Sequence, residues 1–122
     1  MFIKTEGHEA HFFGTPADFN GISRAIRKCK LGATIRLPLE KNQAGLTSLN
    51  IACTSGVGSI GLRNPDAFIM YPERSRNLLS PCFAMPTETQ PGSVFFISRL
   101  QIDFLQALED DSLDVVLHVS PT

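Results

Sequence analysis

Residues 14–32 read GTPADFNGISRAIRKCKLG and carry the clearest secondary-structure pattern in the chain. Thr15 is a favourable N-cap residue, and Pro16 fits the first helical position, where its missing N–H costs nothing. Asp18 follows the cap by three residues, which completes a capping-box pattern. Gly32 is a natural stop. Apolar residues between these limits recur at spacings of three and four: Phe19, Ile22, Ile26 and Cys29. The stretch therefore predicts an amphipathic helix that needs a sheet to lie on.

The composition indicates one globular domain. The chain has 122 residues, of which 43% are hydrophobic and 19% charged, with a formal net charge of −1. We therefore expect no electrostatic nucleic-acid binder. No apolar run approaches the ~20 residues that span a bilayer, so we expect no membrane partner. The first residues lack a basic region followed by an apolar core, so we also expect no secretory signal.

The three cysteines are widely spaced in the chain. They are Cys29, Cys53 and Cys82, an odd number in neither a disulfide nor a zinc pattern. Cys29 and Cys53 fall in the periodic apolar patterns of a helix and a strand, so both are predicted to be small buried hydrophobes. This usage indicates a reducing, cytoplasmic setting, and we expect no metal and no cofactor.

Strand patterns surround the predicted helix. Residues 2–13 predict a strand that breaks into a hairpin near Gly7. Residues 94–97 fit either a short strand or the entry to a helix, and a second amphipathic helix is expected over residues 100–108. The other predicted strands are 33–39, at an edge because of Pro38, then 49–53, 60–62, 67–71 and 115–119. We expect an α+β fold, with an antiparallel or mixed sheet of about five strands and two amphipathic helices packed on one face.

The predicted core and a long loop complete this picture. Residues 72–92 contain four prolines and lose the periodic pattern, so we expect a long Pro-rich loop there. The predicted core is Phe19, Ile22, Ile26, Ile35, Leu37, Ile51, Phe68, Met70, Phe104, Leu108, Val115 and Leu117.

Three motifs resemble catalytic or cofactor-binding sites. Residues 56–61 match G-x-G-x-x-G, but Leu62-Arg63-Asn64-Pro65 cannot open the helix that a dinucleotide site needs. We expect instead a tight hairpin with glycines at positive φ. His8, Glu9 and His11 have the wrong spacing for a zinc helix, so we interpret these histidines and His118 as unconnected. Cys82 is the one cysteine outside a predicted element, and nothing local lowers the pKa of its thiol.

Charged clusters are the remaining candidates for a binding site. Arg24, Arg27, Lys28 and Lys30 are interpreted as a solvated face that complements the helix dipole. Acidic residues near the end of the second predicted helix oppose that dipole, which marks them as candidates for partner binding. The acidic candidates are Asp103, Glu109, Asp110, Asp111 and Asp114. A polar patch beside the loop adds Arg63, Glu73, Arg74 and Arg76, of which Arg74 and Arg76 are further partner-binding candidates.

The strand that leads through Gly14-Thr15-Pro16-x-Asp18-Phe19 into a helix and then short strands resembles small bacterial immunity proteins encoded beside polymorphic toxins. The resemblance covers residues 12–39. It implies a cytosolic, non-enzymatic protein that binds and blocks a cognate toxin domain. An acidic surface would suit a basic toxin. The alternative is a small enzyme or small-molecule-binding protein with residues 72–92 as a lid over a pocket.

Overall fold

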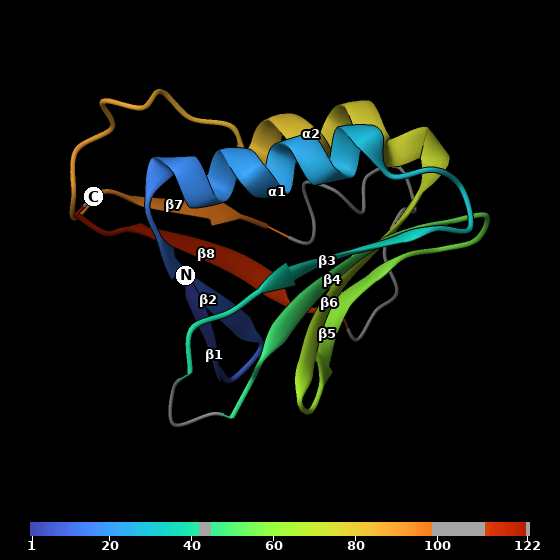
Figure 1. Ribbon diagram of the computed structural model, residues 1–122, viewed down its shortest axis with the longest axis horizontal. Helices are drawn as coiled ribbons and strands as arrows, with labels where there is room; N and C mark the ends of the chain where they lie inside the picture. The colour runs from blue at the N-terminus through green and yellow to red at the C-terminus, as the bar shows by residue number, and fades with distance from the viewer. Residues whose placement is uncertain (42–44, 99–111, 122) are drawn as a thin grey trace.

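The computed structural model describes residues 1–41, 45–98 and 112–121. Within these ranges the chain forms an α+β fold of two α-helices and two four-stranded mixed sheets. The α+β class and the mixed pairing are therefore confirmed. The expectation of a single sheet of about five strands was wrong, because eight strands divide into two sheets. Figure 1 shows both sheets on the same side of the helix pair.

Sheet A has the strand order β1-β2-β8-β7. β1 (Phe2–Glu6) and β2 (Glu9–Gly14) form the expected antiparallel hairpin, with Gly7 at φ 59° in its turn. β8 (Asp114–Val119) pairs parallel with β2, and β7 (Val94–Ile97) pairs antiparallel with β8. The last strand of the chain therefore lies beside one of the first. The sequence left open whether residues 94–97 form a short strand or the entry to a helix, and they form a strand.

Sheet B has the strand order β3-β4-β6-β5. It contains β3 (Thr34–Pro38), β4 (Ser48–Thr54), β5 (Ser59–Arg63) and β6 (Asp66–Pro72). β3 lies at an edge, as Pro38 predicted. β6 pairs parallel with β4 and antiparallel with β5, so it lies between them. β4 and β5 are therefore not a hairpin, although they follow one another in the sequence.

The helix α1 (Pro16–Lys28) begins as the sequence predicts. The Thr15 side chain accepts a hydrogen bond from the Asp18 N–H, and the Asp18 carboxylate accepts one from the Thr15 N–H. The predicted stop at Gly32 was wrong, because the helix ends at Lys28 and Cys29 is its C-cap. Gly32 adopts φ 82° in the turn before β3, and its N–H donates to the carbonyl of Cys53.

The segment 72–92 is not a continuous loop. A 3-10 turn, η1 (Glu73–Ser75), leads into a second helix, α2 (Arg76–Phe83), which packs along α1 (Figure 1). Leu79 and Phe83 of α2 are fully buried. The Asn20 side chain of α1 also bonds both the N–H and the C=O of Met85 just beyond α2. The helix expected over residues 100–108 lies outside the described residues.

The hydrophobic core lies between the two sheets and under the helices. Six of the predicted core residues are buried there: Phe19, Ile22, Ile26, Ile51, Val115 and Leu117. Ile35 and Leu37 are half-buried against the core, and Phe104 and Leu108 lie outside the described residues. The assignment of Phe68 and Met70 to the core was wrong. β6 instead buries Ala67, Ile69 and Tyr71, and period-two alternation turns Phe68 and Met70 to the other face.

Candidate functional site

The outer face of sheet B has several features of a binding site among the described residues. Residues that are paired across strands share a face, so the register defines three rows of side chains on it. Its side chains are half-buried or exposed, with buried Ser48 the exception. We call this surface the open face of sheet B. Its rows are Thr34, Ala52, Met70 and Ser59; Arg36, Asn50, Phe68 and Gly61; and Pro38, Ser48, Asp66 and Arg63.

A polar network crosses one end of the open face. Asp66 accepts a hydrogen bond from the Ser48 hydroxyl and forms an ion pair with Arg36, whose Nη2 lies 3.3 Å from Oδ2. Arg36 Nε also donates to Asn50 Oδ1 at 3.3 Å. The Ser48 hydrogen bond, followed by the Arg36 charge, lowers the pKa of the Asp66 carboxyl against the opposing effect of burial. The carboxylate of Asp66 is therefore ionised at neutral pH, with its oxygens already bonded.

An aromatic ring and a second arginine form the other part of the face. The guanidinium of Arg63 lies over the Phe68 ring, 5.8 Å from its centroid. Gly61 makes room for that ring, because a Cβ at this position would lie 3.1 Å from Phe68 Cζ. Phe68 therefore extends over the edge strand β5 and covers its glycine. Such an arrangement stabilises edge glycines and keeps the ring half-exposed.

The middle of the open face is hollowed. A shallow cavity of about 360 Å³ is lined by Thr34, Asn50, Ala52, Arg63, Asp66, Phe68 and Met70. Its floor is apolar, and its rim carries one carboxylate, one amide and one guanidinium. This size admits one side chain or a small ligand.

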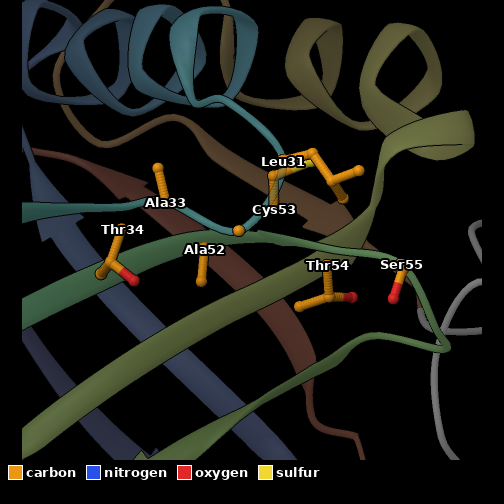
Figure 2. Close-up of a pocket in the computed structure, with 8 residues that line it drawn as sticks. Leu31, Ala33, Thr34, Ala52, Cys53, Thr54 and Ser55 are labelled. Carbon is orange, nitrogen blue, oxygen red and sulfur yellow. The ribbon is translucent and has the colours of Figure 1, made fainter.

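A second hollow adjoins the first one at Thr34 and Ala52. Figure 2 shows its lining residues, which come from the turn after α1 and from the ends of β3 and β4. Its volume is about 440 Å³, and its polar side chains are those of Thr34, Thr54, Ser55 and Cys53. Cys53 Sγ accepts a hydrogen bond from Arg76 Nη2 at 3.3 Å. The described lining residues carry no carboxylate, imidazole or amine.

The predicted partner-binding residues fall in three places. Asp103, Glu109, Asp110 and Asp111 lie outside the described residues. Asp114 begins β8, where its backbone N–H donates to the carbonyl of His8. Arg74 is exposed on η1. The structure does not bring Asp114 into the open face of sheet B, which is built from other strands.

Arg76 is bound within the chain. Its Nη2 donates to the carbonyl of Cys29 as well as to Cys53, and its Nη1 donates to the carbonyl of Arg27 at 3.4 Å. These carbonyls belong to the C-terminal end of α1, where positive charge is favourable. Arg76 therefore joins α2 to the end of α1 and to β4.

The sequence suggested that the three histidines are unconnected, and this was wrong for two of them. His11 and His118 lie on adjacent strands, with His11 Nδ1 2.8 Å from His118 Nε2. His11 Nε2 also lies 3.3 Å from Glu9 Oε1, and the His118 ring stacks on Phe13 at 4.3 Å between centroids. His8 is exposed in the turn between β1 and β2. In the described ranges no group of three or more potential ligands is placed to hold a metal ion.

The glycine motif and Cys82 have structural roles. A dinucleotide site would need a helix after these glycines, but the strand β5 follows Gly56–Gly58. The rejection of a dinucleotide site is therefore consistent with the structure. The expected hairpin and positive φ values were both wrong, since β6 separates β4 from β5 and neither Gly56 nor Gly58 has a positive φ. Gly58 is needed for close packing against the backbone of Met70 and Tyr71. Cys82 is half-buried in α2, and burial raises the pKa of its thiol.

The sequence pattern did not predict the open face, because it assigned Phe68 and Arg63 to other places. The pattern placed Phe68 in the core and Arg63 in a polar patch beside the loop. One signal was available: residues 67–71 are apolar at every position, so both faces of this strand must be apolar.

No family model, curated protein or solved structure matches the chain. Among the helices that the structure describes, none is long and apolar enough to cross a membrane.

Proposed function

We propose that this protein is a non-enzymatic protein-binding module of the toxin-immunity kind, which acts in the cytoplasm and blocks a cognate protein. We further propose that the partner binds the open face of sheet B. The observation that carries this proposal is the combination of half-buried Phe68, Met70 and Ala52 with a polar rim, on a sheet face that no described element covers.

The composition of this face supports a protein partner. Protein interfaces combine an apolar, aromatic or methionine-rich centre with a polar rim, and arginine is enriched in them. The open face has an aromatic ring and a methionine in its centre and Arg36, Arg63 and Asp66 on its rim. It is also built on regular strands, so little conformational entropy would be lost on binding.

Two of the predicted partner-binding residues are held elsewhere in the described part of the chain. Arg76 is occupied by the carbonyls of α1, and Asp114 belongs to sheet A. We therefore propose sheet B, rather than the acidic cluster, as the principal contact surface.

The alternative function depended on residues 72–92 as a lid over a pocket. Residues 76–83 form α2 and pack on α1, with Leu79 and Phe83 fully buried. This part of the segment is integral to the core and gives no support to the lid interpretation.

The proposal is tested by co-expression with the product of the gene that lies next to the gene for this chain. We expect that product alone to arrest growth, the present chain to restore growth, and the two proteins to purify together. If the neighbouring product is harmless, or is harmful but neither bound nor suppressed, the immunity function is refuted.

A pair of variants locates the contact. Met70→Lys places a charge in the centre of the open face, while the long apolar stem of lysine preserves packing along the sheet. Leu78→Lys is the matched control, since Leu78 is 38% exposed on α2, away from this face. Both variants should fold with native circular dichroism. Only Met70→Lys should lose growth protection, and equal protection by the two variants would exclude the open face as the contact.

A further inference from the structure

The two arginines of the open face differ in what they already bind. Arg36 is neutralised by Asp66 and also donates to Asn50. Arg63 is paired across the strands with Asp66 in the register, yet no ion pair joins the two side chains. Within the described ranges, the interaction of its guanidinium is with the Phe68 ring. Among the described residues, Arg63 is therefore a cation with no carboxylate paired to it, at the rim of an apolar hollow.

The contact with Phe68 prepares Arg63 for a specific partner group. A guanidinium over an aromatic face remains charged, and its N–H groups point outward in the plane of the group. That plane matches the two oxygens of a carboxylate. The hollow beside it has Ala52, Phe68 and Met70 among its lining residues, so an apolar side chain next to that carboxylate would be buried at the same time.

We infer that the partner is a protein segment that presents an aspartate or glutamate beside an apolar side chain, with the carboxylate bound by Arg63 and the apolar group placed in the hollow. This inference rests on the proposed function and names the chemistry that the same face recognises. The partner group at this contact is therefore negatively charged, whereas a basic toxin bound by the acidic cluster would present positive charge.

The charge of Asp66 favours a protein over a nucleic acid. Its ionised carboxylate lines the same hollow as Arg63, and Arg36 balances only that one charge. A chain of phosphates along the face would meet this carboxylate, whereas a single partner carboxylate at Arg63 would not need to approach it. The hollow therefore selects one negative group with an apolar neighbour.

The test uses the full-length protein, immobilised, and a displayed library of random peptides. Wild type should select peptides in which Asp or Glu lies next to an aromatic or aliphatic residue. Arg63→Glu should retain about a tenth or less of the affinity for these peptides, because a charge-assisted contact becomes repulsive. Arg24→Glu is the matched control, since Arg24 is exposed on α1, and it should bind as wild type does.

Four outcomes of the peptide selection would overturn the inference. These are no selection at all, selected peptides without an acidic residue, equal capture by Arg63→Glu, and selected peptides that Met70→Lys also binds at full affinity. Two further probes address other occupants of the face. Tight binding of a single-stranded oligonucleotide that is lost in Arg63→Glu, or a dimer of wild type that Arg63→Glu separates, would also overturn it.

Failure of this inference is distinguishable from failure of the proposed function. If Met70→Lys abolishes growth protection and Arg63→Glu leaves it intact, the immunity function is supported and the recognition of a carboxylate by Arg63 is refuted. If acidic peptides bind through Arg63 but the chain does not protect growth against the neighbouring gene product, the recognition chemistry is supported and the immunity function is refuted.

Discussion

His11 on β2 and His118 on β8 share one hydrogen bond, with 2.8 Å between His11 Nδ1 and His118 Nε2. In such a pair one imidazole donates and the other accepts, so both rings cannot be protonated while the bond persists. Burial, then the charges of His11 and Lys4, lower the pKa of His118 below its usual 6.5. Glu9 is the carboxylate that faces this pair, at His11 Nε2. The pair therefore connects the parallel strands β2 and β8 in a pH-dependent way.

We predict that acidification destabilises the protein through His118. Between its lowered folded-state pKa and the unfolded-state value near 6.5, the unfolded chain binds more protons. The free energy of unfolding therefore decreases as the pH falls through this window, and the full contribution is present above it. Urea unfolding at about pH 7.5 and about pH 5.5 measures the difference, since histidine titrates in this range.

Two variants isolate the source of this pH dependence. His118→Phe keeps a ring that can stack on Phe13 and should flatten the dependence, while His8→Gln should leave it unchanged because His8 is exposed. An undiminished pH dependence in His118→Phe would assign the effect to other groups.

A second prediction concerns Arg76 and the end of α1. Arg76→Ala removes hydrogen bonds to the carbonyls of Arg27 and Cys29 and to the Cys53 thiol. We expect a loss of about 1.5–3 kcal/mol in the free energy of unfolding, the range for hydrogen bonds made by a charged group. Arg24→Ala removes an exposed arginine from the same helix and should cost less than about 0.5 kcal/mol. Equal costs in chemical denaturation would show that Arg76 does not hold α2 against α1.

The parts of the fold that depend on nearby residues were predictable from the sequence. The α1 capping box lies within four residues, and the strand limits follow local alternation and turns. The sheet order was not predictable, since short connections on both sides of β5 favour hairpins and say nothing of the parallel pairing between β4 and β6. α2 was missed because an eight-residue helix containing Pro81 depends on packing rather than on propensity.

The candidate site was unpredictable for the same physical reason. The contact between Arg63 and Phe68 arises from strand register, and the register of β5 against β6 is a long-range property. The alternation of residues 67–71 was ambiguous as well, because an entirely apolar strand fits either phase. Only the neighbouring strands decide that Ile69 points inward and Phe68 outward.

A third prediction tests this phase directly. Ile69→Ala should cost about 2–5 kcal/mol, because Ile69 is fully buried and its truncation leaves a cavity. Phe68→Ala should cost about 1 kcal/mol, since the ring is half-exposed and mainly covers Gly61. The two costs are compared by urea unfolding. A larger loss for Phe68→Ala than for Ile69→Ala would reverse the faces of β6.

The last prediction uses the two glycines that open the G-x-G-x-x-G pattern. A Cβ added at Gly58 would overlap the carbonyl oxygen of Met70 and lie 2.8 Å from the Tyr71 Cα, so the backbone of β6 would have to move. A Cβ at Gly56 would meet nothing within 4 Å, and this residue has no positive φ. Gly58→Ala should therefore lose about 3 kcal/mol or fail to fold, because overpacking against backbone has little room to relax. Gly56→Ala should be neutral or up to about 1 kcal/mol more stable, since alanine restricts the unfolded chain. Thermal unfolding of the two variants beside wild type measures this contrast. A stable Gly58→Ala protein would mean that β5 does not pass this close to β6, and a destabilised Gly56→Ala protein would restore a conformational role to the first glycine.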